Sequence, residues 1–174
     1  MNSIDVVIPT MWKEPNFVEY LKKYCVCKSV KKLYIIDNSR SDRPVDPIFN
    51  DEKIEIIDHG KNIYVNPAWN EGYYRSTSEV ICLLNDDIDV DVSLFEDISN
   101  LDFTDIDLIG VHLKGSVDNF HIVEHPDKEE KIFRLAVNKS QPIGGQSYAF
   151  GVCMFIKRSS YKPIPSLYQV WFGD

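Results

Sequence analysis

The chain has 174 residues, of which 44% are hydrophobic, and it carries 27 acidic against 19 basic side chains. This length suffices for one substantial core, while the acidic excess excludes a general surface for nucleic acid or anionic membranes, which needs clustered Lys and Arg. Because no apolar run reaches the length of a membrane span and no secretory signal opens the chain, we expect a soluble, cytoplasmic protein.

The first half of the chain alternates between short apolar runs and segments with helical periodicity. The apolar runs predict strands at residues 5–9, 33–36, 54–57 and 80–84. Phe17, Leu21 and Tyr24 recur at helical spacing and predict a helix over about 15–25. Strands separated by helices or long connections imply parallel pairing with right-handed crossovers, so we expect a Rossmann-like sheet.

A second helix is predicted between the third and fourth strands. Asn66 is the expected N-cap, and Pro67 suits the first helical turn. Trp69 and Tyr73 lie four residues apart, so they can pack on one face of this helix. Gly72 is expected to let another backbone approach the helix closely.

The second half of the chain is expected to complete the same domain. Ser93 and Glu96 have the Ser-x-x-Glu spacing of a capping box and predict a short helix. Further strands are predicted at 107–113, 119–124, 132–137 and 148–156, and the second and third of these are expected to form a hairpin.

The cysteines and glycines exclude several classes of site. The four cysteines, Cys25, Cys27, Cys82 and Cys153, have neither the number nor the spacing of a disulfide scaffold or a zinc site. We interpret them as small buried apolar side chains. No Gly-rich phosphate loop is present, so hydride transfer and P-loop chemistry are disfavoured.

Polar side chains follow the predicted strands. Asp37 follows the second strand, Asp58 the third, and Asn85, Asp86 and Asp87 the fourth. Open α/β sheets place ligands at the carboxyl ends of their strands, and adjacent acids can hold a hard divalent cation. Taken alone, an Asn-Asp-Asp triplet is more often a turn that closes a strand, and Asp37 alone fits an Asx turn equally well.

The order of these motifs resembles that of GT-A glycosyltransferases, particularly those of family 2. In chain order the matching segments are Val6-Val7-Ile8-Pro9-Thr10, Ile35-Ile36-Asp37-Asn38-Ser39, Asn62, Asn70-Glu71-Gly72, the strand at 80–84 with Asn85-Asp86-Asp87, 150–158 and 170–174. Asn85 stands where a strict Asp-x-Asp motif has its first acid. The compact length also resembles that of small glycosyltransferases encoded by large viruses and phages, which would place the protein in the host cytoplasm.

The resemblance implies a GT-A fold, in which a mixed, mostly parallel central sheet is flanked by helices. It further implies a single domain over residues 1–174. Residues 1–90 would form the nucleotide-binding half of this domain, and residues 91–174 the acceptor-side half.

The resemblance also implies a reaction, in which a sugar is transferred from a nucleotide-diphosphate sugar to a hydroxyl of a glycan or glycoprotein acceptor. The implied transfer depends on a metal ion and inverts the anomeric centre, and a UDP-sugar is the favoured donor. The implied cofactor is Mn²⁺ or Mg²⁺. The implied donor-binding residues are Pro9, Thr10, Asp37, Asn62, Asn70 and Asp86, the metal-binding residues are Asp87 and Asn85, and the catalytic base is Asp174. Trp171 and Phe172 are candidates for stacking on the acceptor sugar, with core packing as the alternative.

Two other functions stay open at this point. A sugar-nucleotide pyrophosphorylase also combines an α/β sheet with carboxylate-bound metal, but it normally begins with a Gly-rich, Arg/Lys-bearing phosphate loop that this sequence lacks. A nucleotide-sugar or carbohydrate-binding module would keep the fold without turnover, as Asn85 in the acidic motif permits. Donor turnover measured with Mn²⁺ separates these functions.

Overall fold

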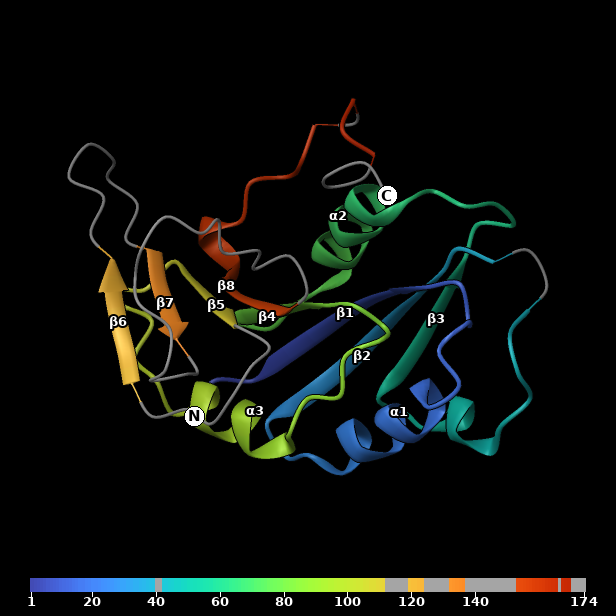
Figure 1. Cartoon of the computed structure of the whole chain (residues 1–174), viewed down its shortest axis with the longest axis horizontal. Helices are drawn as coiled ribbons and strands as arrows, with labels where there is room; N and C mark the ends of the chain where they lie inside the picture. The colour runs from blue at the N-terminus through green and yellow to red at the C-terminus, as the bar shows by residue number, and fades with distance from the viewer. Residues whose placement is uncertain (40–41, 112–118, 124–131, 137–152, 166, 170–174) are drawn as a thin grey trace.

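The computed structural model describes residues 1–39, 42–111, 119–123, 132–136, 153–165 and 167–169. These residues form one eight-stranded sheet in the order β3-β2-β1-β4-β8-β5-β7-β6 (Figure 1). The strands are β1 (Ile4–Thr10), β2 (Val30–Asp37), β3 (Ile54–Asp58), β4 (Val80–Leu84), β5 (Leu108–Val111), β6 (Asn119–Val123), β7 (Ile132–Ala136) and β8 (Cys153–Lys157). The helices are α1 (Phe17–Val26), α2 (Val65–Arg75) and α3 (Val92–Ser99), with short 3-10 helices η1 (Pro47–Asn50) and η2 (Arg158–Ser160).

The strand pairing confirms the predicted fold class. β1 pairs in parallel with both β2 and β4, β3 pairs in parallel with β2, and β7 does so with β5. β8 is antiparallel to both β4 and β5, and β6 is antiparallel to β7, as the predicted hairpin requires. The protein is therefore an α/β protein with a mixed, mostly parallel central sheet flanked by helices.

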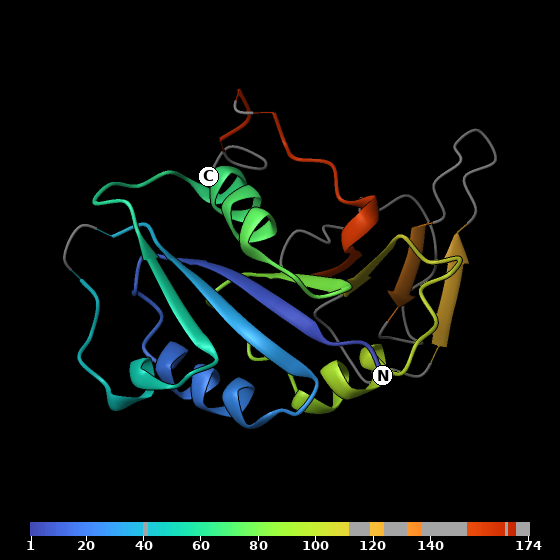
Figure 2. The same cartoon turned by 180° about the vertical axis from the view of Figure 1, so that it is seen from behind.

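The central strands separate two hydrophobic cores. Val6 of β1 packs with Phe17 of α1 and Phe95 of α3 in one core, whereas Val7 packs with Trp69 of α2 in the other. Figures 1 and 2 show α1 and α3 on one face of the sheet and α2 on the opposite face. Because successive residues of a strand point to opposite faces, a strand covered on both sides must be apolar throughout, as β4 is.

Most predicted elements are present, and β4 has the predicted bounds. All four cysteines are buried and unpaired, as predicted. The strands predicted at 107–113 and 148–156 are observed as β5 and β8. Residues 112–113 and 148–152 of these predicted strands lie outside the described residues. None of the helices in the described part of the chain is both long and apolar enough to cross a membrane.

The start of α2 differs from the prediction, because Asn66 is not its N-cap. The helix begins at Val65, and its N-cap is Tyr64, whose backbone has φ 67° and ψ 176°. The side chain of Asn62 forms the preceding turn, since its Oδ1 accepts the amide of Tyr64 at 2.7 Å. Asn66 is fully buried, and its side-chain amide donates to the carbonyl of Tyr168 at 3.2 Å. A tertiary hydrogen bond therefore uses the side chain that the sequence assigned to capping.

The capping box predicted for Ser93 is also wrong. Helix α3 begins two residues earlier than predicted, at Val92, and its N-cap is Asp91, whose Oδ1 accepts the amide of Ser93 at 2.9 Å. An Asp carboxylate is a strong N-cap acceptor, and its charge is favourable at a helix N-terminus. The nearby Asp91 therefore takes the capping position, and Ser93 lies in the first turn.

Helix α2 lies very close to β1 at Gly72. A Cβ atom on Gly72 would lie only 2.2 Å from Cγ1 of Val7. The predicted close approach is therefore correct in its position, but its partner is a β1 side chain and not a backbone. Trp69 and Tyr73 lie in the same core beneath α2, as their spacing predicted.

We predict that Gly72→Ala lowers the free energy of unfolding by about 1 to 3 kcal/mol, the usual range for overpacking a core. The clash with Val7 outweighs the roughly 1 kcal/mol by which Ala normally favours a helix interior over Gly. Urea denaturation measures this change. In a Val7→Ala background the cost should shrink, because Cγ1 and Cγ2 of Val7, at 2.2 and 2.4 Å, are removed while its Cβ, at 2.8 Å, remains. An equal loss in both backgrounds would contradict the close approach.

Candidate active site

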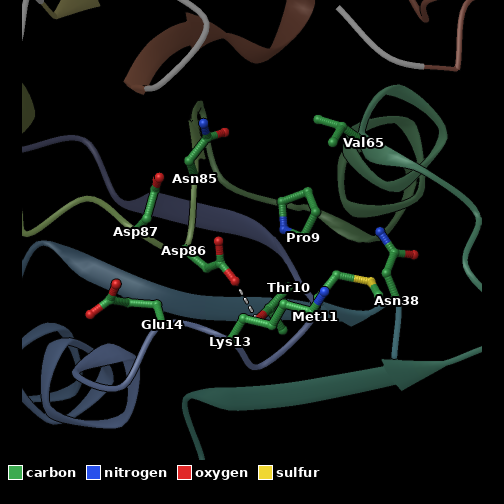
Figure 3. A pocket seen from close by; sticks show the side chains of 10 residues that line it. All are labelled: Pro9, Thr10, Met11, Lys13, Glu14, Asn38, Val65, Asn85, Asp86 and Asp87. Carbon is green, nitrogen blue, oxygen red and sulfur yellow. Dashed lines mark hydrogen bonds between the residues drawn. The ribbon is translucent and has the colours of Figure 1, made fainter. Parts of the chain in front are cut away.

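A cavity of about 420 Å³ lies at the carboxyl ends of β1 and β4. These strands are parallel neighbours, and the chain leaves β1 toward α1 and β2, away from β4. Ligands of open α/β sheets bind at such a point, where connections diverge. Figure 3 shows the described residues that line this pocket: Pro9, Thr10, Met11, Lys13, Glu14, Asn38, Val65, Asn85, Asp86 and Asp87.

A hydrogen bond joins the two strand ends within this pocket. The hydroxyl of Thr10 donates to Oδ2 of Asp86 at 2.6 Å (Figure 3). The same oxygen accepts the amide of Trp12 at 2.8 Å. Burial raises the pKa of Asp86, and the neighbouring charge of Asp87 raises it further, whereas the Thr10 hydrogen bond lowers it. The site therefore holds a partly buried carboxylate whose ionised form is stabilised by the Thr10 hydroxyl and by the backbone amides of Met11 and Asp86.

The end of β4 fits a divalent cation that is shared with a phosphate-bearing ligand. Asp87 is exposed, and Asn85 and Asp86 are partly buried beside it. Within the described ranges no three His, Cys, Asp or Glu side chains form a complete metal site. Mg²⁺ and similar cations, however, usually bind through one or two carboxylates and complete their coordination with water and substrate phosphates. The pair of carboxylates, with the amide oxygen of Asn85, matches this kind of site.

Asp37 lies next to the pocket but is engaged within its own turn. It pairs with Thr10 in the β1–β2 register, and the following amide, of Asn38, donates to the carbonyl of Thr10 at 2.8 Å. The Asp37 side chain is only 3% exposed, and its Oδ1 accepts both the amide and the hydroxyl of Ser39. The Asx turn is therefore present, and the role of Asp37 in base recognition stays a prediction.

The side chain of Asn38 links the pocket to the loop before α2. Its Oδ1 accepts the amide of Ile63 at 3.1 Å, and its side-chain amide donates to the carbonyl of Tyr64 at 3.4 Å. Tyr64 thereby keeps a backbone conformation that is almost confined to glycine. Asn62, a predicted donor contact, is exposed, caps this turn and is not among the residues that line the pocket.

Asn70, another predicted donor contact, holds a distant segment of the chain. Its Oδ1 accepts the hydroxyl of Tyr161 at 2.7 Å and the amide of Ile164 at 2.9 Å, and its side-chain amide donates to the carbonyl of Ile164 at 2.8 Å. It does not line the pocket. Asp174, with Trp171 and Phe172, lies outside the described residues, so its predicted role stays a prediction.

A profile of glycosyl transferase family 2 matches residues 5–164, which is most of the chain. The chain belongs to glycosyl transferase family 2. No curated protein matches it. The match includes the ends of both β1 and β4, and therefore all the residues that line the pocket.

Solved structures with the same fold include other glycosyltransferases. The mannosyltransferase PcManGT from Pyrobaculum calidifontis, in complex with GDP-Man and Mn²⁺, has a TM-score of 0.52 and 15% identity over 64% of this chain and 36% of its own. S. aureus TarS 1-349 has a TM-score of 0.56 and 16% identity, covering 67% of this chain and 37% of its own. The structure of TarS 1-349 in complex with UDP-GlcNAc has a TM-score of 0.56 and 16% identity, covering 65% of this chain and 35% of its own. The chain spans little more than a third of these proteins.

The pocket of this family 2 chain also contains residues that the sequence analysis missed. They are Met11, Lys13, Glu14, Asn38 and Val65. Four of them directly follow a β1 or β2 residue that was predicted as a donor contact, or lie within a few positions of it. The carboxyl ends of β1 and β2 are therefore the sequence signal for these residues, because the loops that follow the two strands also line the pocket.

We predict that Thr10→Val lowers the free energy of unfolding by about 1 to 3 kcal/mol, the cost of leaving buried polar groups without a partner. The substitution keeps the shape of the side chain but removes the partner of both Asp86 and the Trp12 amide. Thr10→Ser is the matched control, because it keeps the hydroxyl. Equal denaturation midpoints for the two variants would contradict a stabilising role for this hydrogen bond.

Proposed function

We propose that this family 2 chain transfers a sugar from a nucleotide-diphosphate sugar, with a UDP-sugar favoured, to a hydroxyl of a glycan or glycoprotein acceptor, and that the reaction inverts the anomeric centre. The observation that carries the proposal is the carboxylate pair at the end of β4, held beside β1 by the Thr10 hydrogen bond. Glycosyltransferases with this fold in complex with GDP-Man and Mn²⁺, and with UDP-GlcNAc, support it.

We assign the binding of Mn²⁺ or Mg²⁺ to Asp87, with Asn85 beside it. When bound, such a cation acts as a Lewis acid that neutralises the charge developing on the leaving diphosphate. Asp86 is assigned to the donor, because its Oδ2 is already fixed by Thr10 and its carboxylate is less exposed than that of Asp87. The two adjacent acids therefore have different tasks that follow from their different exposure.

We assign the nucleotide base to the wall formed by the ends of β1 and β2. Asp37 at the end of β2 is proposed to accept the ring N–H of uracil in a charge-assisted hydrogen bond. Pro9 and Thr10 are the proposed donor contacts from β1, and Asn62 and Asn70 those from the α2 region. Residues 1–90 then act as the nucleotide-binding half of a single domain over residues 1–174, and residues 91–174 as its acceptor side.

We predict that Asp87→Asn abolishes the dependence of donor binding on Mn²⁺, because the charged ligand is removed. Calorimetric titrations with UDP, GDP and dTDP sugars, each with and without Mn²⁺, measure this dependence and rank the bases. Asp89→Asn is the matched control, since Asp89 is exposed, pairs with Lys23 at 2.6 Å and does not line the pocket. Donor affinity that still rises with Mn²⁺ in Asp87→Asn would contradict the metal assignment.

Turnover distinguishes an enzyme from a module that only binds. Release of nucleotide diphosphate from the preferred donor with Mn²⁺ supports transfer or donor hydrolysis. Tight binding without release supports a nucleotide-sugar-binding module. Formation of the nucleotide sugar from a triphosphate and a sugar phosphate would instead identify a pyrophosphorylase.

Asp174 is the proposed general base that takes the proton of the acceptor hydroxyl. We predict that Asp174→Asn keeps donor and metal binding but lowers the transfer rate by about 10² to 10⁴, the usual contribution of general base catalysis. Deleting residues 171–174 should have the same effect. Steady-state transfer to a verified acceptor is the measurement, and unchanged transfer in both variants would assign the deprotonation to another carboxylate.

A further inference from the structure

Lys13 is the cationic side chain of an otherwise acidic pocket. Of the described residues that line the pocket, Lys13 alone carries a positive charge, whereas Glu14, Asp86 and Asp87 carry negative charges. Within the described residues Lys13 has no hydrogen bond or ion pair. Lys22 and Lys23 in the following helix differ in this respect, because they pair with Glu19 and Asp89 respectively.

The position of Lys13 is set by its neighbour Trp12. Trp12 has φ 57°, a left-handed conformation that bulky residues rarely adopt. Its ring packs at 5.5 Å from Phe17 and at 5.4 Å from Phe49, and its amide donates to the hydroxyl of Thr10. The indole N–H is buried without a partner, which adds to the cost of this arrangement. The loop is therefore held by Trp12, and Lys13 itself contributes no hydrogen bond to it.

Both non-glycine residues with positive φ in the described chain directly precede a residue that lines this pocket. Trp12 precedes Lys13, and Tyr64, with φ 67°, precedes Val65. Strained backbone persists only where the surrounding structure enforces it, and it is typical of ligand-binding sites. At the first of these two positions the strained turn places the exposed residue Lys13 in the wall of the pocket.

The charges of the pocket determine which part of a donor Lys13 suits. A nucleotide-diphosphate sugar carries negative charge on its phosphates, while the sugar and a uracil base are neutral. The lining carboxylates repel these phosphates, and a compact ammonium with three donors is a common phosphate ligand. Resting on the proposed function, we propose that Lys13 binds the diphosphate of the donor from the β1 side of the pocket, whereas Asp86 and Asp87 lie on the β4 side.

The test compares a nucleoside with its diphosphate, using the base that the parent chain prefers. For uridine and UDP with Mg²⁺, Lys13→Met should weaken UDP about tenfold, equivalent to ~1.4 kcal/mol, and leave uridine unchanged in calorimetric titrations. Lys13→Arg should keep most of the UDP affinity, because it keeps the charge. Lys28→Met is the control for net charge, since Lys28 is exposed and does not line the pocket.

Each outcome separates this inference from the proposed function. Three results would overturn the role of Lys13 while the parent chain still binds the nucleotide. They are an unchanged UDP affinity in Lys13→Met, equal losses of uridine and UDP affinity in Lys13→Met, and an equal loss of UDP affinity in Lys28→Met. A parent chain that binds neither nucleoside nor diphosphate, of any base, would overturn the proposed function and this inference with it. Circular dichroism and unchanged denaturation midpoints show that each variant is folded.

Discussion

The hydrogen bond from Thr10 to Asp86 connects the ends of two parallel strands, and the geometry of the pocket depends on it. The two residues lie 76 positions apart in the sequence, yet β1 and β4 are neighbours in the sheet. Beyond this bond the chain continues into α1 after β1 and into α3 after β4. The pocket lies at these strand ends, and the hydrogen bond joins its β1 wall to its β4 wall.

The opposite end of the same two strands is fixed by a buried carboxylate. Asp5 is fully buried, and its Oδ2 accepts the hydroxyl of Ser76 at 2.8 Å and the amides of Thr77 and Ser78 at 2.9 and 3.0 Å. These bonds hold the turn from α2 into β4 against β1. Because a shift of one residue would exchange the two faces of β4, this turn also determines which side of the sheet Asp86 faces.

The sequence was sufficient for elements whose pattern follows from burial alone. The apolar run of β4 fits a central strand of a sheet that is covered on both faces, and the bounds of this strand were predicted correctly. The carboxylate pair beyond it was found for the same reason. The assignments that failed, Asn66 as a cap and Ser93 as a capping box, concern polar side chains that satisfy several local motifs equally well. The missing pocket residues lie beyond the strand ends, and for Lys13 the left-handed turn at Trp12 that precedes it is not indicated by any sequence pattern for a bulky residue.

Asparagine side chains show why motif order can be right while the role of a motif residue is still undecided. An amide side chain both donates and accepts, so it can bridge two backbone segments as readily as it can bind a ligand. Asn38 bridges Ile63 and Tyr64, and Asn70 bridges Tyr161 and Ile164. The oxygen of Asn70 already accepts two hydrogen bonds, which is its usual capacity. A substitution of Asn70 would therefore shift residues 161–164, and a measured loss of donor affinity would not by itself show a contact with the donor.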